Sequence, residues 1–323
     1  MMIKIIITVL RYILLAAVIM FGSWYVITNY ERFASGAHFT WFNISVLVGL
    51  NLLTILCESI RLKIMVDKLK YNLSLLHSWH IISVIQAVNH MILKAGTLSG
   101  GYYLSKKYKI SFHDYIAFIV TYPVMMVLSS CIFGLFTTLL FIILGLSVDL
   151  FILLFFTAII LFSTGFIGIA SIHIPLNYLP KFTRRFFTSW KEIYSDYQLL
   201  FTLMVVELFY FLTCSLRFMT AVSMFSGDVR FLDSVVVVTV GNFLRLASIV
   251  PGGIGVAEVA SGWTAGLLGK DVGLAGLSAG LDRVVYVVLI MIFGAIGFFT
   301  LSGRSEFHKP SEKDKDLMHE VVS

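Results

Sequence analysis

The sequence predicts an all-α fold, a polytopic bundle of membrane helices that contains two broken helical hairpins. The first observation is composition: of 323 residues, 59% are hydrophobic and 13% are charged, and the mean hydropathy is +0.92. Soluble globular proteins have roughly twice that charged fraction. The second is that apolar stretches long enough to cross a bilayer as a helix recur along the chain. The third is that glycines or a lysine interrupt two of these stretches.

Six apolar segments are predicted to be complete spans: residues 5–27, 39–57, 115–146, 150–172, 199–225 and 274–301. The first is expected to be retained, because its apolar run is longer than that of a signal peptide and no small-residue cleavage site follows it. Cys57, Cys131 and Cys214 lie singly within apolar segments, so they predict neither a disulfide framework nor a metal site.

Basic residues gather beside these spans and predict their direction. They follow the second span at 61–70, precede the third at 106–109 and follow the fourth at 181–191. Because cytoplasmic loops are enriched in Lys and Arg, we expect a cell-membrane protein with both termini in the cytoplasm. Residues 302–323 are polar and are expected to form a flexible cytoplasmic tail. The formal net charge of +6 therefore reflects topology and does not indicate nucleic-acid binding.

Two apolar stretches are predicted to be re-entrant hairpins, which enter and leave the bilayer on one side. Residues 77–104 have basic clusters at both ends and are interrupted from Lys94 to Thr97. Residues 231–268 must begin and end outside if the C-terminus is cytoplasmic, and they are interrupted from Pro251 to Gly255.

The order of these elements is span, span, hairpin, span, and then the same order upside down. It predicts a single membrane domain over residues 1–301 with inverted halves of about 1–146 and 150–301. In inverted repeats, broken helices from the two halves commonly meet near the bilayer midplane and form a substrate site.

The most informative motif is Pro251-Gly252-Gly253-Ile254-Gly255-Val256-Ala257-Glu258. Proline lacks a backbone donor and glycine adopts backbone angles closed to other residues, so a helix must break here. Such a break is tolerated at membrane depth only where protein or a water-filled cavity satisfies the freed backbone groups. The following helix would direct amide donors at a phosphate or carboxylate. The alternative is a tight turn that Glu258 merely caps.

The run from Arg245 to Glu258, preceded by Asn242, resembles the signature of the lysylphosphatidylglycerol synthase transmembrane family, which includes flippase-like proteins. The run from Asn89 to Thr97 is similar to the first-half motif of that family, and the resemblance extends over about residues 5–301. It differs in that Lys94 stands near the place of a proline, and no carboxylate follows nearby. About twenty residues follow the last span, so the aminoacyltransferase domain of the bifunctional members, and aminoacyl transfer, are not expected. No enzyme is predicted, since no serine, zinc or two-carboxylate signature is present, although an intramembrane enzyme stays an alternative.

The candidate substrate-binding residues lie at the two breaks or within the spans: Lys94, Gly96, Asn242, Arg245, Pro251, Gly252, Gly253, Gly255, Glu258, Asp282 and Glu207. Since an unpaired buried charge is costly, Arg245 is expected to pair with Glu258, Glu207 or Asp282. Asp282 and its neighbour Arg283 point about 100° apart on a helix and should face different partners. Lys94 would either neutralise a lipid phosphate or extend to the cytoplasmic face.

Three further features have interfacial interpretations. Glu58 and Arg61 end the second span and are expected to form an interfacial ion pair. Arg217 lies near the outer end of the fifth span, where its side chain could extend to the interface. Residues 176–197 mix basic and aromatic side chains, which fits an amphipathic helix at the inner headgroup level or an ordinary basic loop.

The leading hypothesis is a transporter or flippase for a lipid or lipid-linked anionic substrate, with Lys94, Arg245 and Glu258 at the headgroup. One alternative is an ion-coupled carrier of small solutes, in which Glu258, Glu207 or Asp282 binds a proton. Another is a non-catalytic subunit that assists membrane-bound enzymes of cell-envelope lipid or glycan synthesis. The sequence predicts no cofactor and no metal site, because no recognised ligand set is present.

Overall fold

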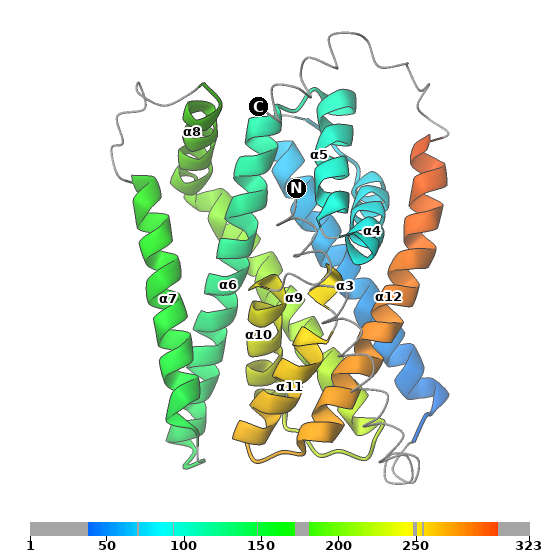
Figure 1. Ribbon diagram of the computed structural model, residues 1–323, viewed down its shortest axis with the longest axis vertical. Helices are drawn as coiled ribbons and strands as arrows, with labels where there is room; N and C mark the ends of the chain where they lie inside the picture. The colour runs from blue at the N-terminus through cyan, green and yellow to red at the C-terminus, as the bar shows by residue number, and fades with distance from the viewer. Residues whose placement is uncertain are drawn as a thin grey trace, which may run out of the picture.

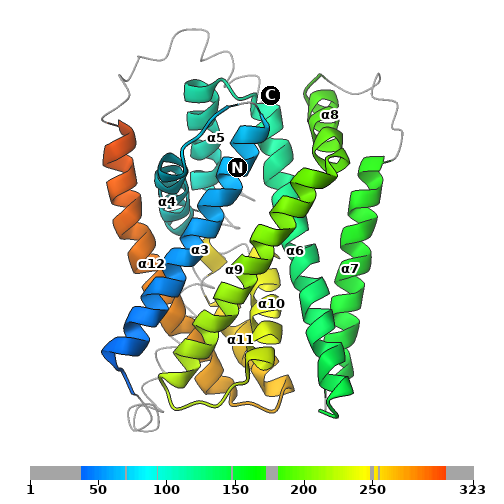
Figure 2. The same ribbon diagram turned by 180° about the vertical axis from the view of Figure 1, so that it is seen from behind.

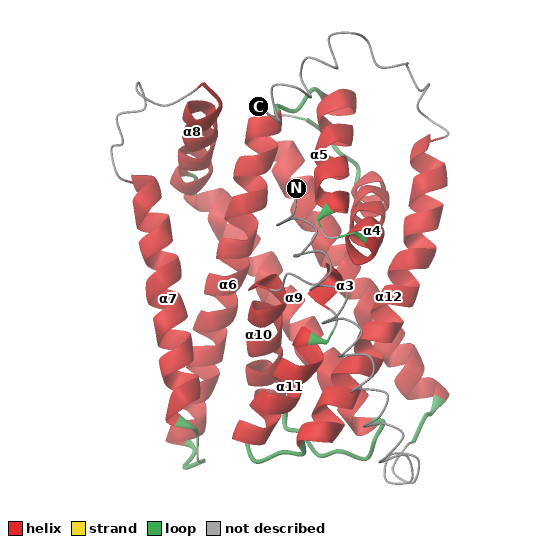
Figure 3. Ribbon diagram, viewed as in Figure 1, coloured by secondary structure: helices red, strands yellow, loops and turns green. Residues whose placement is uncertain are grey.

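The computed structural model describes residues 38–302, with gaps at 70, 93, 147, 172–180, 248–250 and 254. The described part contains ten α-helices and one short 3-10 helix, and no strand, which confirms the all-α fold (Figure 3). The predicted first span and nearly all of the predicted tail lie outside the described residues.

Four helices are long and apolar enough to cross a membrane: α3 (Trp41–Lys68), α6 (Phe112–Ile143), α9 (Tyr197–Ser223) and α12 (Val272–Ser302). They coincide with the second, third, fifth and sixth predicted spans. The predicted fourth span forms α7 (Leu150–Ser171), which packs against α6. The main difference is that α3 continues to Lys68 instead of ending near Cys57, because Glu58 and Arg61 are buried inside the bundle.

Short polar side chains start several of these helices. Each accepts a hydrogen bond from a backbone N–H of the first helical turn, which would otherwise have no partner. Thr40 does this for α3, Asp149 for α7, Asp196 for α9 and Asp271 for α12. These capping residues therefore help to determine where the apolar helices begin.

Each predicted hairpin forms two helices joined at the predicted break. The first consists of α4 (Leu75–Met91) and α5 (Ala95–Tyr108). The second consists of α10 (Phe231–Ala247), the 3-10 helix η2 (Pro251–Gly253) and α11 (Val256–Leu267). Figure 1 shows α4 and α5 in the upper half of the molecule and α10 and α11 in the lower half.

The neighbours of the two hairpins correspond. Helix α4 packs against α3 and α12, while α10 packs against α9 and α6. Helices α3 and α9 lie side by side on the rear face of the molecule, which Figure 2 turns toward the viewer. The break at η2 contacts α4, so the two hairpins meet inside the bundle.

The basic segment between the fourth and fifth spans forms α8 (Lys181–Ser195) at the upper end of the molecule (Figure 1). Its aromatic side turns toward protein: Trp190 and Tyr194 are buried, and Phe186 and Phe187 pack against the same hydrophobic cluster. Much of the apolar face of this helix is therefore covered by the bundle.

Candidate functional site

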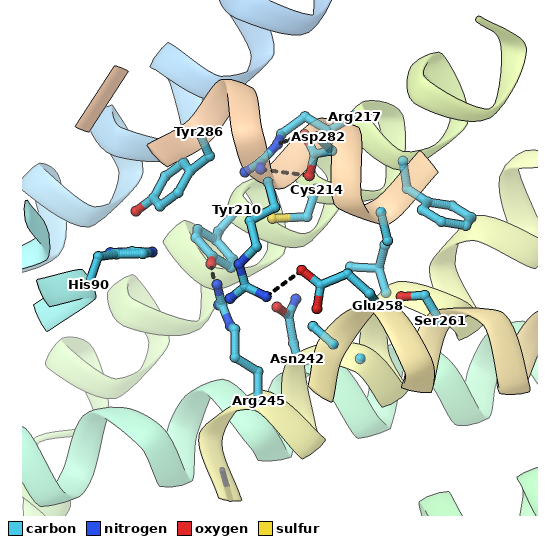
Figure 4. A pocket seen from close by; sticks show the side chains of 16 residues that line it. His90, Tyr210, Cys214, Arg217, Asn242, Arg245, Glu258, Ser261, Asp282 and Tyr286 are labelled. Carbon is cyan, nitrogen blue, oxygen red and sulfur yellow. Dashed lines mark hydrogen bonds and ion pairs between the residues drawn. The ribbon is translucent and has the colours of Figure 1, made fainter. Parts of the chain in front are cut away.

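A cavity of about 90 Å³ lies where the two hairpins meet (Figure 4). Five helices contribute to its wall: α4, α9, α10, α11 and α12. The polar residues of the lining are His90, Tyr210, Arg217, Asn242, Arg245, Glu258, Ser261, Asp282, Arg283 and Tyr286. A space of this size has room for several water molecules or a small polar group.

The second break has the backbone geometry that its glycines allow. Gly252 has φ 63° and Gly253 has φ 67°, in the left-handed region that side chains rarely adopt. A Cβ atom at Gly252 would lie 2.9 Å from Cδ2 of His90, which belongs to the first hairpin. Glycine is therefore needed here both for the chain reversal and for the close approach of the two hairpins.

Arg283 satisfies the carbonyl groups that the break leaves free. Its guanidinium donates to the carbonyl oxygen of Gly253 at 3.0 Å and to that of Gly252. The same group donates to Glu258 Oε1 at 2.7 Å. One charged side chain from α12 thus holds the broken backbone and pairs with the acid that follows it.

A second ion pair closes another part of the cavity. Arg217 donates to both carboxylate oxygens of Asp282, at 2.8 and 2.7 Å, and to Thr54 Oγ1 at 3.1 Å. Asn51 Nδ2 also donates to Asp282 Oδ1. Arg217 is 7% exposed, so the interpretation that it extends to an interface is wrong. Asp282 and Arg283 do face different partners, as their spacing predicts.

Arg245 has no carboxylate within 4.0 Å among the described residues, and its Nη2 donates instead to the hydroxyl of Tyr210 at 3.2 Å. The predicted pairing of Arg245 with an acid is therefore wrong. The reason is that each candidate acid is already paired with another arginine: Glu258 with Arg283, Asp282 with Arg217, and Glu207 with Arg61.

The side-chain amide of Asn242 lies one helical turn before Arg245 on α10. Its Nδ2 is buried and has no hydrogen-bond partner in the part of the chain that the structure describes. Figure 4 shows both side chains on the same side of the cavity. Together they provide a positive charge that has no carboxylate partner and an amide donor that has no acceptor, among the described residues.

Glu207 lies behind the cavity wall and does not line it. Its Oε1 accepts from Arg61 Nη1 at 2.6 Å, and Glu58 Oε1 lies 3.6 Å from Arg61 Nη2. Glu58, Arg61 and Glu207 are at most 6% exposed. The predicted interfacial location of Glu58 and Arg61 is therefore wrong, because α3 continues past them and α9 covers them.

The family described as lysylphosphatidylglycerol synthase TM region matches residues 4–294. The chain belongs to this family. A comparison with curated proteins finds no match. Both breaks lie within the matched region, so the cavity is part of the family's membrane region.

The first break of this family member does not line the cavity. Lys94 is exposed, with φ 56°, at the turn between α4 and α5. Gly96 is buried between these helices, where a Cβ atom would lie 1.9 Å from the carbonyl oxygen of Ile85. Asn89 bridges the break by accepting from the backbone N–H of Thr97 and donating to its hydroxyl, both at 3.0 Å. The structure thus gives Gly96 a packing role.

Five cavity residues with large polar side chains were not among the candidates from the sequence: His90, Tyr210, Arg217, Arg283 and Tyr286. A signal for the α9 residues was present. Glu207, Tyr210, Cys214 and Arg217 are spaced three, four and three residues apart, so they share one face of α9. A polar stripe on an otherwise apolar span indicates a buried functional face.

Proposed function

We propose that this protein binds the anionic headgroup of a lipid or lipid-linked substrate in the cavity and moves it between membrane leaflets. The observation that supports this most is Arg245, a cavity arginine with no carboxylate partner in the described part of the chain. A membrane lipid is accordingly the proposed partner, and no catalytic step is included.

The charges of the lining favour a singly charged anion. Arg217, Arg245 and Arg283 oppose Glu258 and Asp282, which leaves one positive charge in excess. Two of the arginines are engaged by the acids, so Arg245 and the amide of Asn242 are the groups that meet a ligand. Arginine suits this role because its fixed set of N–H donors matches the oxygens of phosphate. The cavity holds a headgroup, and acyl chains would remain in the bilayer.

The proposed mechanism is rocking of two inverted halves around this site. It is supported by the corresponding neighbours of the two hairpins and by their meeting inside the bundle. The proposed orientation puts the upper end in Figure 1 at the cytoplasm, since α5 ends there with Lys106 and Lys107 and α8 lies there.

Thiol labelling tests the orientation. The three native cysteines are buried, so a new exposed thiol reports its own side of the membrane. In cells, Lys106→Cys should react only with a membrane-permeant reagent, and Asp228→Cys should react with an impermeant one. The reverse pattern would overturn the orientation, and reaction of both with the impermeant reagent would contradict the three spans α6, α7 and α9 that separate the two positions.

Lipid movement is tested in vesicles that contain the purified protein and trace fluorescent phosphatidylglycerol or phosphatidylcholine, with a quencher that bleaches only the outer leaflet. The anionic lipid should exchange between leaflets faster than the zwitterionic one, and Arg245→Gln should reduce its rate about tenfold or more. Arg185→Gln, the same change at an exposed position of α8, serves as the matched control and should behave as wild type. Equal rates for both lipids, or equal effects of both variants, would overturn the proposal.

A further inference from the structure

Glu58 and Glu207, together the carboxyl pair, share a single arginine in the core of the bundle. Arg61 contacts both, and its guanidinium also donates to the hydroxyl of Tyr122. Glu207 is 1% exposed, and Phe211, one turn further along α9, belongs to a buried apolar cluster with Met126. Two carboxylates and one guanidinium would leave one negative charge in excess in the buried core of the bundle.

The two acids differ in how their oxygens are satisfied. Glu58 Oε2 accepts from Gln86 Nε2 at 3.0 Å and from the hydroxyl of Tyr286 at 3.3 Å. Glu207 Oε1 faces Arg61, but its Oε2 is buried and has no hydrogen-bond partner among the described residues. A buried carboxylate oxygen without a donor is costly, whereas a carboxylic acid bearing a proton on that oxygen is neutral. Of the four oxygens of the carboxyl pair, Glu207 Oε2 is therefore the one best placed to bind a proton.

One layer of aromatic side chains separates the carboxyl pair from the cavity. Tyr210 lines the cavity and accepts from Arg245, while its ring centroid lies 4.8 Å from Cζ of Arg61. Tyr286 lines the cavity and donates to Glu58. His90, also in the lining, lies against Tyr286 with ring centroids 5.8 Å apart. A charge in the cavity thus acts on the carboxyl pair through packed side chains, where the effective dielectric constant is lower than in water.

The charges of the two regions balance across this layer. The cavity has one arginine in excess, and the carboxyl pair has one carboxylate in excess. Other titratable or charged groups also face the carboxyl pair or the aromatic layer. They are Cys57 on α3, His90 on α4, Tyr122 on α6, Tyr210, Cys214 and Arg217 on α9, Arg245 on α10 and Tyr286 on α12.

We propose that the carboxyl pair is a proton-binding site linked to the cavity, such that Glu207 takes up one proton from solvent when an anion binds beside Arg245. This inference rests on the proposed function. In the empty state, Arg245 balances the excess carboxylate across the tyrosine layer. A singly charged anion neutralises Arg245 and leaves the excess carboxylate without its balance, and the O–H bond formed at Glu207 Oε2 restores neutrality. Transport of a singly charged anion would then be coupled to movement of a proton.

Linkage fixes the sign of the effect. If anion binding promotes proton uptake, then protonation must tighten anion binding by the same factor. The affinity for the anion should therefore fall as pH rises over the range in which Glu207 releases its proton. For one linked proton the dissociation constant rises at most about tenfold per pH unit.

The test measures protons taken up on binding of dihexanoyl phosphatidylglycerol, a water-soluble anionic lipid, by the full chain in neutral detergent. Calorimetric titration in two amine buffers of different ionisation enthalpy gives the proton number. Wild type should take up a substantial fraction of one proton per lipid, and binding should weaken as pH rises. Glu207→Gln should still bind, with a proton number near zero and an affinity independent of pH. Glu192→Gln, the same change at an exposed position of α8, should show the proton number and affinity of wild type.

The possible outcomes distinguish failure of the proton site from failure of the proposed lipid-binding function. If wild type does not bind the lipid at all, the proposed function fails. If wild type binds it without proton uptake, or if Glu207→Gln retains uptake, the proton site fails while the anion site stands. Should Glu207→Gln not fold, the proton number and the pH dependence of wild type alone still decide whether binding is linked to a proton.

Discussion

The two helix breaks occupy corresponding positions in the two hairpins, yet they are closed by different chemistry. The first is bridged by neutral side chains, Asn89 and Thr97, and its charged residue Lys94 points outward. The second is held by Arg283, whose guanidinium donates to backbone carbonyls and pairs with Glu258 beside the cavity. Two breaks at corresponding positions therefore have different roles. The second break forms part of the polar site, and the first supports that site by packing.

The largest expected effect comes from removing the charge that closes the second break. Arg283→Met leaves two carbonyls and Glu258 without their donor. Breaking a fully buried ion pair costs about 3–5 kcal/mol, so this part-buried pair should cost up to about 3 kcal/mol. Thermal unfolding in detergent should show a drop in melting temperature far beyond that of Arg185→Met, an exposed control. A loss similar to the control would mean that the second break needs no charge.

The next effect concerns backbone geometry at the same break. Gly252→Ala places a side chain at φ 63° and 2.9 Å from His90, for which we expect a loss of about 1–3 kcal/mol. Gly165→Ala on α7 is the matched control, because nothing lies within 4 Å of its Cβ position. The comparison fails if both alanines are tolerated equally in the unfolding experiment.

At the first break a smaller loss is expected. Asn89→Ala removes the bridge to Thr97, and two neutral hydrogen bonds in a part-buried position contribute about 1–2 kcal/mol together. Lipid movement should continue in this variant at a rate near that of wild type. Abolished movement in a folded Asn89→Ala protein would show that the first break also takes part in function.

The smallest effect has the opposite sign. Lys94 is a non-glycine residue at φ 56°, where glycine is under less strain, so Lys94→Gly should be neutral or stabilising by up to about 1 kcal/mol. Its lipid affinity should not change, because the side chain does not line the cavity. Weaker binding of anionic lipid by this variant would restore the hypothesis that Lys94 meets a phosphate.

Local chemistry explains what could be predicted from the sequence. Apolar length defined the spans, and the clustered glycines after Pro251 located the second break, because both signals act over a few residues. The end of α3 was misplaced because Glu58 and Arg61 resemble the polar end of a span when their partners on α9 are unknown. Likewise, the sequence could not show that Arg245 is the cavity arginine without a carboxylate partner among the described residues. That depends on which acids the other cavity arginines approach in space.

The most direct test of the account is a structure of the protein in nanodiscs of phosphatidylglycerol, with an antibody fragment bound to increase its size. We predict a lipid phosphate within hydrogen-bonding distance of the Arg245 guanidinium and the Asn242 amide, with the ion pairs of Arg217 and Arg283 unchanged. An empty cavity in which Arg245 pairs with Glu258 or Asp282 would contradict the account.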